Sequence, residues 1–180
     1  MNKFLVVVDM QYDFIDGALG DSEAQEIVPK VAKKICGDYR DVIATLDTHG
    51  SDYLDTREGK MLPVKHCVKY THGWCMPGQI IDALAVARPC HNVVCKSTFS
   101  SDEIVDIIRR SAPAYEPESD MCIQIVGLRT DICVISNAIM LRNAFPEAHI
   151  VVDSSCCAGT TPELHKAALD VMRSCHIEIE

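Results

Sequence analysis

Short apolar runs alternate with segments of helical periodicity along the whole of this 180-residue chain. The first run, residues 4–8, is apolar at every position, which is typical of a strand covered on both faces. Further strands are predicted at residues 41–46, 91–95, 121–126, 148–152 and 176–179. Strands that alternate with helices favour a parallel sheet with helices on both faces. We therefore predict an α/β fold: a three-layer sandwich around a mainly parallel six-stranded sheet.

The segments between the strands carry the spacing and end signals of helices. In the first of them Ile27, Val31 and Ile35 share one face, Asp21 or Ser22 can cap the start, and Gly37 can end the helix. Helices are predicted at residues 21–36, 77–87, from 100 or 101 through 108, from 130 onward, and at 161–174. No repeat or linker interrupts this order, so residues 1–180 are expected to form a single domain.

One long stretch, residues 50–74, shows no regular pattern. It is polar and carries two of the chain's seven histidines. Loops of this length inside compact domains usually have a function, so we expect this stretch to contribute to a site.

Charge and cysteine content exclude several classes of protein. A net charge of −9 argues against nucleic acid or an anionic membrane surface as partner. The N-terminal apolar run is too short for a signal peptide or a membrane span, and the expected location is the cytoplasm. The ten cysteines are then not expected to form a disulfide framework, and the absence of any C-x-x-C excludes zinc-finger spacing.

The segment at residues 121–138 combines a buried strand, a tight turn at Gly127 and a helix that starts near Thr130. Cys133 falls on the first turn of that helix, where the helix dipole lowers a thiol pKa and free N–H groups can receive an oxyanion. This layout suits a nucleophile for acyl chemistry. The alternative is a cysteine that belongs to the core, since free cysteines are often buried.

Polar residues follow the predicted strands: Asp9, Asp47 and Lys96 come directly after the first three, and Cys133 follows the fourth. In parallel sheets, sites form beyond the carboxyl ends of the strands, so these side chains are expected to converge. Asp9 can take the proton of the Cys133 thiol, and Lys96 can stabilise both anions. The alternatives are a strand-end cap for Asp9 and a solvated side chain for Lys96.

The same edge of the sheet offers ligands for a metal. Asp47 and His49 are two residues apart at a strand end, so both point to one side. Together with His66 they would make a three-ligand metal site with open positions. A loop with two solvated histidines is an equal alternative.

Five stretches of the chain carry a likeness to a known family. In sequence order they are VVDMQYDF at residues 7–14, TLDTH at 45–49, HCV at 66–68, CKS at 95–97 and GLRTDICV at 127–134. On these motifs the chain resembles the isochorismatase-like cysteine hydrolases, and within them the nicotinamidase/pyrazinamidase branch. The motifs stand in the order and spacing of the family and cover nearly the whole chain.

The resemblance implies a Rossmann-type strand order and a catalytic triad of Asp9, Lys96 and Cys133. It also implies a cis peptide bond between Leu128 and Arg129. The backbone amides of Arg129 and Cys133 would form the oxyanion hole.

In nicotinamidases a divalent ion, expected here to be Zn²⁺, binds the pyridine nitrogen of the substrate. The resemblance places that ion on Asp47, His49 and His66, and places Phe14 against the substrate ring. Many nicotinamidases have a tryptophan before the later metal histidine; residues 62–65 lack it, and Trp74 is the expected substitute.

Two further departures from the family pattern bear on the substrate. Some relatives have an additional histidine in the metal loop, and residues 51–61 contain none. Arg129 stands where the family usually has a small residue. It either reads a carboxylate or carbonyl group of the substrate or points outward.

The resulting hypothesis is a cysteine amidohydrolase that acts on a small carboxamide, with nicotinamide as the first choice and a thioester on Cys133 as intermediate. One alternative is a metal-independent hydrolase of isochorismate, a ureido compound or another amide. A second is a non-enzymatic protein that binds a metal or senses redox state. The expected partner is a small-molecule amide, and self-association is implied because relatives are often oligomers.

Overall fold

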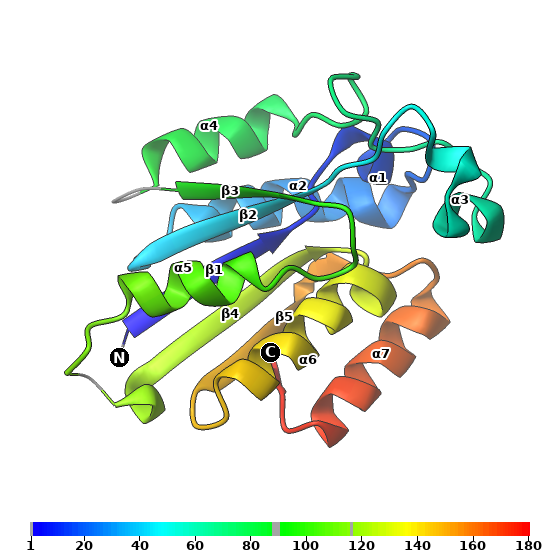
Figure 1. Ribbon diagram of the computed structural model, residues 1–180. Helices are drawn as coiled ribbons and strands as arrows, with labels where there is room; N and C mark the ends of the chain where they lie inside the picture. Colours follow the sequence, from blue (N-terminus) through cyan, green and yellow to red (C-terminus); the bar gives the residue numbers. More distant parts are fainter. Residues whose placement is uncertain (1, 88–90, 116) are drawn as a thin grey trace.

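The structure, a computed structural model, describes residues 2–87, 91–115 and 117–180. Its centre is a sheet of six strands in the order β3-β2-β1-β4-β5-β6, with every neighbouring pair parallel (Figure 1). The strands are β1 (Asn2–Val8), β2 (Asp41–Asp47), β3 (His91–Lys96), β4 (Met121–Leu128), β5 (His149–Ala158) and β6 (Glu178–Ile179). The predicted α/β class and the Rossmann-type strand order are confirmed.

Helices cover both faces of this sheet (Figure 1). On one face lie α1 (Tyr12–Ile15), α2 (Ser22–Ile35) and α4 (Gly78–Val86); on the other lie α5 (Glu103–Ser111), α6 (Ile135–Ala144) and α7 (Pro162–Ser174). Side chains alternate along each strand, so Leu5 and Val7 pack into the first layer while Phe4, Val6 and Val8 pack into the second. The apolar run of β1 is fully buried because it contributes to both cores.

Two predicted helices begin with a side-chain cap, and the cap at Asp21 was predicted. The Asp21 side chain accepts from the Ala24 backbone N–H at the start of α2, and Thr161 accepts from Leu164 at the start of α7. The helix predicted from residue 100 or 101 instead begins at Glu103, with Asp102 in the capping position and no side-chain cap. No serine side chain caps this helix, although the Ser101 carbonyl accepts from the Ile104 N–H, so the capping position lies one or two residues later than predicted.

Short helical pieces depart further from the prediction. The stretch expected to be irregular contains a 3-10 turn (Tyr53–Asp55) and α3 (Arg57–Met61), and another 3-10 turn spans Glu118–Asp120. A π-helical turn, Thr130–Val134, precedes α6, where a single helix was predicted. Elements of three to five residues are too short to show a periodicity in sequence, which is why these and α1 were missed.

The sheet reverses its strand order between β1 and β4, and this is where the candidate site lies. Val8 pairs with Gly127 at the carboxyl end of both strands. Gly127 has φ of +119°, and a Cβ there would lie 2.1 Å from the Val8 carbonyl oxygen. Only glycine allows β4 to pass this close to β1 at that point.

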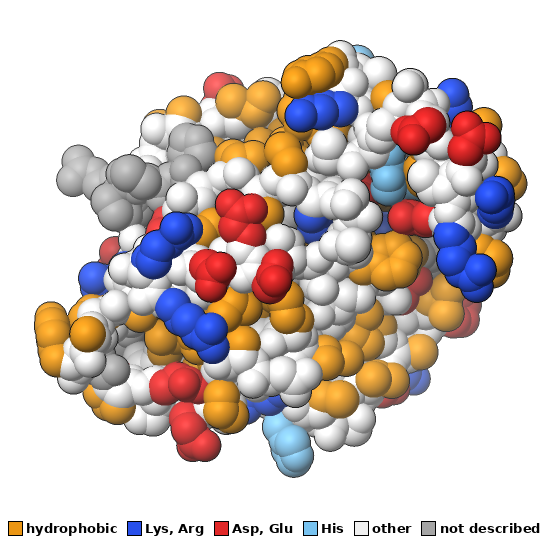
Figure 2. Space-filling view, in the orientation of Figure 1, with side chains coloured by type: hydrophobic (Ala, Val, Ile, Leu, Met, Phe, Trp, Pro, Cys, Tyr) orange, Lys and Arg blue, Asp and Glu red, His pale blue; other side chains and the backbone are white. Residues whose placement is uncertain are grey.

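None of the helices in the three described ranges combines the length and apolar character needed to cross a bilayer. In the space-filling view, one face of the molecule is hollowed beside the region of α3, with acidic side chains at the rim and a histidine visible inside (Figure 2).

Candidate active site

Asp9, Lys96 and Cys133 are brought together by the fold. Lys96 Nζ lies 2.6 Å from Asp9 Oδ2 and 3.6 Å from Cys133 Sγ. Asp9 follows β1 in a left-handed conformation (φ 47°), Lys96 ends β3, and Cys133 sits in the π-helical turn after β4. β2 lies between β1 and β3, so the long lysine side chain spans the end of a strand to reach Asp9. All three side chains are buried, which rules out a solvated Lys96.

Thr45 holds the carboxylate of Asp9 from the other side. Its hydroxyl donates to Asp9 Oδ1 at 2.6 Å and accepts from the Asp9 backbone N–H at 3.1 Å. Sequence reasoning assigned Thr45 no role. The available signal was one polar residue, Thr45, inside an apolar stretch of a predicted strand.

Burial and mutual charge set the protonation of this cluster. Burial raises the pKa of Asp9, although the adjacent Lys96 ammonium acts in the opposite direction. Burial on its own would lower the pKa of Lys96, but Asp9, Cys133 and Asp47 raise it, so the ammonium persists. A charged lysine therefore stands beside a carboxyl group that binds its proton more readily than an exposed one.

The expected depression of the Cys133 pKa is wrong for the site as it stands. Burial raises the pKa of this thiol well above its ordinary value, and the Asp9 carboxylate adds to the effect. Desolvation of the buried thiol therefore outweighs the effect of the helix dipole. The resting cysteine is thus a thiol that needs a base, and Asp9 is the base in reach.

Asp47, His49 and His66 also converge. One ligand atom from each lies within 4.8 Å of the others. His49 Nε2 is 2.9 Å from Asp47 Oδ2, and His66 Nε2 is 3.4 Å from the same oxygen. Hydrogen bonding to both rings outweighs burial and lowers the pKa of Asp47 to about 2. Two imidazole nitrogens and a carboxylate oxygen facing one point are a donor set that suits Zn²⁺ or a similar divalent ion.

The ligands of this set are oriented by neighbouring groups. His66 Nδ1 is 2.8 Å from the Val64 carbonyl oxygen, an arrangement that places the N–H on Nδ1 and leaves Nε2 as the ligand atom. The Gln11 side chain accepts from the Asp47 backbone N–H and donates to its carbonyl, which fixes the ligand strand. Tyr53 packs against both imidazoles, with ring centroids 4.6 Å from His49 and 4.9 Å from His66. Sequence reasoning missed Tyr53 and gave Gln11 no role.

Glu58 adds a second carboxylate beside the histidines. Its Oε1 lies 3.8 Å from His49 Nε2, and the residue lines the same cavity. Glu58 belongs to α3, in the stretch predicted to be irregular, so only the tertiary structure reveals it.

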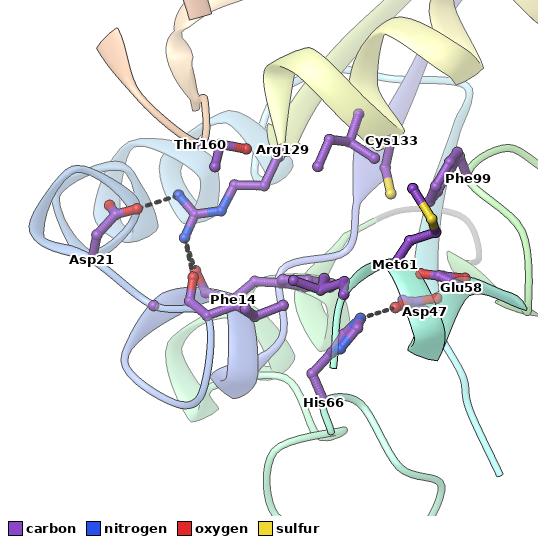
Figure 3. A pocket seen from close by; sticks show the side chains of 14 residues that line it. Phe14, Asp21, Asp47, Glu58, Met61, His66, Phe99, Arg129, Cys133 and Thr160 are labelled. Carbon is purple, nitrogen blue, oxygen red and sulfur yellow. Dashed lines mark hydrogen bonds and ion pairs between the residues drawn. The ribbon is translucent and has the colours of Figure 1, made fainter. Parts of the chain in front are cut away.

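A cavity of about 550 Å³ connects the two clusters. Figure 3 shows Phe14, Asp47, His66 and Cys133 around this space, with the Phe14 ring between the thiol and the histidine. The ring centroids of Phe14 and His66 are 5.5 Å apart. The remaining lining residues are mainly apolar and include Leu19, Met61, Leu62, Phe99 and Ile132.

Trp74 does not take the expected position. It is not among the lining residues of the cavity; its indole N–H donates to the Thr48 hydroxyl at 2.8 Å, and its ring meets Tyr70 edge-on. The substrate contact expected of Trp74 is therefore unsupported. The expected cis peptide bond between Leu128 and Arg129 is present. Arg129 lines the cavity, but its guanidinium is directed toward Asp21 and away from Cys133 (Figure 3).

Comparison with solved structures finds the same fold in several proteins. Pyrazinamidase of Pyrococcus horikoshii in complex with zinc is 25% identical, with a TM-score of 0.74 over 100% of this chain and 99% of that one. Pyrazinamidase/nicotinamidase from Streptococcus mutans is 26% identical, with a TM-score of 0.79 over 99% and 100% of the two chains. The yeast nicotinamidase bound to the inhibitor nicotinaldehyde is 19% identical, with a TM-score of 0.80 over 98% of each chain.

No curated protein matches the chain in sequence. A family model does: the isochorismatase domain matches residues 3–179, which is nearly the entire chain. The strand order, the residues at the β1–β4 switch point and the similarity to solved structures all agree with this match. The chain therefore belongs to the isochorismatase family.

Proposed function

We propose that this protein is a cysteine amidohydrolase that converts nicotinamide to nicotinate and ammonia. The observation that carries the proposal is the contact of Lys96 with both Asp9 and Cys133, beside a cavity that is lined by Cys133 and, from the Asp47–His49–His66 ligand set, by Asp47 and His66. Similarity to a pyrazinamidase in complex with zinc and to a nicotinamidase bound to nicotinaldehyde supports the choice of substrate and metal.

Asp9 acts first, as the general base. It takes the proton from Cys133 Sγ, and the thiolate attacks the amide carbonyl carbon to form a C–S bond. Lys96 stays charged throughout, because Asp9 accepts the proton in its place and the ammonium stabilises the developing thiolate. The carbonyl oxygen becomes an oxyanion, for which the backbone amides of Arg129 and Cys133 are the proposed donors.

Collapse of the tetrahedral intermediate breaks the C–N bond. Asp9 returns its proton to the departing nitrogen, which leaves as ammonia and a thioester remains on Cys133. A water molecule then attacks the thioester carbonyl while Asp9 takes one of its protons. The C–S bond breaks, Asp9 returns that proton to the Cys133 sulfur, and the acid leaves as nicotinate after losing its own proton to solvent. One carboxyl group thus serves as base and acid in turn, a role that suits its raised pKa.

Asp47, His49 and His66 would hold a divalent ion, which supplies a Lewis acid for a ring nitrogen of the substrate. Phe14 lines the cavity beside these ligands, with its ring centroid 5.5 Å from that of His66, and packs on the substrate ring. These three ligands also separate the proposal from a metal-independent hydrolase, which has no use for them.

The direct test is ammonia release from nicotinamide by the purified protein before and after chelation, with metal content measured by elemental analysis. Turnover that falls on chelation and returns with zinc supports the proposal. Cys133→Ala serves as the control and is expected to release no ammonia while it retains its metal. Full turnover by Cys133→Ala, or no turnover by the metal-loaded wild type, would refute it.

A further inference from the structure

Arg129 makes an unusual set of contacts for a residue that lines the candidate cavity. Its guanidinium is buried and donates four hydrogen bonds. Nη1 donates to Asp21 Oδ2 at 2.6 Å and to the Gly159 carbonyl at 3.0 Å. Nη2 donates to the Phe14 and Leu19 carbonyls at 2.8 Å and 2.5 Å. The hydrogens of both terminal nitrogens are therefore used within the protein.

These acceptors come from separate segments that together form one wall of the cavity. Phe14 belongs to α1, Leu19 to the following loop, Asp21 caps the start of α2, and Gly159 directly follows β5. Phe14, Leu19 and Asp21 line the cavity themselves, and Gly159 precedes the lining residue Thr160. A helix of four residues such as α1 has little stability of its own, so its position depends on such contacts.

The same contacts decide which charge the cavity can receive. Arg129 is the one lysine or arginine among the lining residues within the described ranges. Bidentate recognition of a carboxylate needs two parallel N–H groups, and every such pair on a guanidinium includes a terminal nitrogen. Those nitrogens are occupied, and Asp21, Asp47 and Glu58 add negative charge to the lining.

We propose that Arg129 is a positioning residue that determines specificity. It holds the wall formed by residues 14–21 against the π-helical turn that carries Cys133. It also leaves the cavity suited to uncharged amides and closed to amides that carry a carboxylate. The choice between uncharged and carboxylate-bearing amides rests on the function proposed above. The fastening of the wall rests on the hydrogen bonds alone and is tested separately.

The kinetic test compares Arg129→Ala and Asp21→Asn with the wild type on nicotinamide. Asparagine at position 21 still caps α2, because Oδ1 accepts from the Ala24 N–H, but it removes the charged partner of Arg129. We expect KM to rise at least tenfold in Arg129→Ala and less in Asp21→Asn, with a smaller change in kcat since the triad is untouched. Millimolar ethylguanidinium is expected to restore part of the lost affinity in Arg129→Ala and to have no effect on the wild type.

Two results would overturn the positioning role. One is an unchanged KM accompanied by a lower Tm, which would show that Arg129 only stabilises the fold. The other is lack of any rescue by ethylguanidinium in a variant whose KM has risen.

The specificity half is tested with N-carbamoylglycine, an amide that carries a carboxylate. The wild type is expected to hydrolyse it at least a hundredfold less efficiently than nicotinamide. Efficient hydrolysis that is abolished in Arg129→Ala would mean that Arg129 reads the carboxylate, and would contradict the inference.

Hydrogen exchange on the 180-residue chain tests the wall without any substrate. Arg129→Ala is expected to speed exchange in residues 12–21. Arg142→Ala is the matched control, because Arg142 also donates to backbone carbonyls, those of Pro146 and Ala148, and is expected to speed exchange only near them. Unchanged exchange at residues 12–21 in Arg129→Ala would refute the fastening role. If the wild type releases no ammonia from nicotinamide, this experiment still decides it.

Discussion

Replacing Thr45 by valine exchanges one buried hydroxyl near the end of β2 for a methyl group. The size and shape of the side chain stay nearly the same. The hydroxyl donates to Asp9 Oδ1 at 2.6 Å and accepts from the Asp9 N–H at 3.1 Å. Thr45 is 1% exposed and Asp9 is fully buried, so water cannot replace either bond without a rearrangement. Thr45→Val therefore isolates the contribution of this hydroxyl to the general base.

The expected magnitude follows from the two lost bonds. A hydrogen bond to a charged group contributes about 1.5–3 kcal/mol, and a buried N–H left without an acceptor costs about 1–3 kcal/mol. We expect the free energy of unfolding to fall by about 3 kcal/mol, which lowers Tm by about 6–12 °C in a chain of this size.

Thr45→Val should also shift the pH dependence of the reaction in a definite direction. The Thr45 hydroxyl stabilises the charged form of Asp9, so its removal raises the pKa of that carboxyl further above its ordinary value. Activity needs the unprotonated base, and the acid limb of kcat/KM for ammonia release should move to higher pH. The pKa shift is smaller than the full energy of the lost bond, because the Thr45 hydroxyl can also hydrogen-bond the protonated form of Asp9. We therefore expect the acid limb to move by about one pH unit.

The assay is the pH dependence of kcat/KM for nicotinamide in the wild type and in Thr45→Val. Thr161→Val is the control, because it removes a hydroxyl that caps α7 and should cost about 1 kcal/mol without moving the acid limb. An acid limb that stays in place, or moves to lower pH, in a folded Thr45→Val protein would refute the assignment of Asp9 as general base.

Three further predictions test the metal site, the switch point and a surface-proximal ion pair. His66→Ala is expected to lower the bound divalent metal at least tenfold, as measured by elemental analysis after dialysis; retention of a full complement would contradict the ligand assignment. Gly127→Ala places a methyl group 2.1 Å from the Val8 carbonyl oxygen at a positive φ, so the free energy of unfolding in urea should fall by more than about 2 kcal/mol. Burial would raise the pKa of Asp153, but its hydrogen bond and ion pair with Lys34, at 2.7 Å, lower it overall. A depressed carboxyl pKa gives stability that is present above about pH 4 and lost as pH falls. Asp153→Asn should therefore cost about 1 kcal/mol at pH 7. This cost should shrink as the pH falls through 4; a difference independent of pH would exclude the ion pair as its source.

Much of the architecture was predictable because strands buried on both faces have a simple sequence signature. The apolar run of β1 and the alternation of strands with helices predicted a parallel sheet, and polar residues directly after strand ends predicted where Asp9, Lys96 and Cys133 would meet. The backbone position of each of these residues depends mainly on its own strand, so local pattern was sufficient. The five-motif resemblance added the cis bond at Leu128–Arg129, which no local pattern would have indicated.

The sequence by itself therefore determined the class of the fold, the edge of the sheet that carries the site and the residue types that gather there. Tertiary structure alone decided the protonation of Cys133, since desolvation depends on everything packed around the thiol. It alone decided that Thr45 holds Asp9, that Glu58 joins the histidines and that Trp74 stays outside the cavity. It also settled the direction of Arg129, whose partners are as many as 115 residues away in the chain. Contacts between distant segments have no sequence period, and for that reason only the folded chain reveals them.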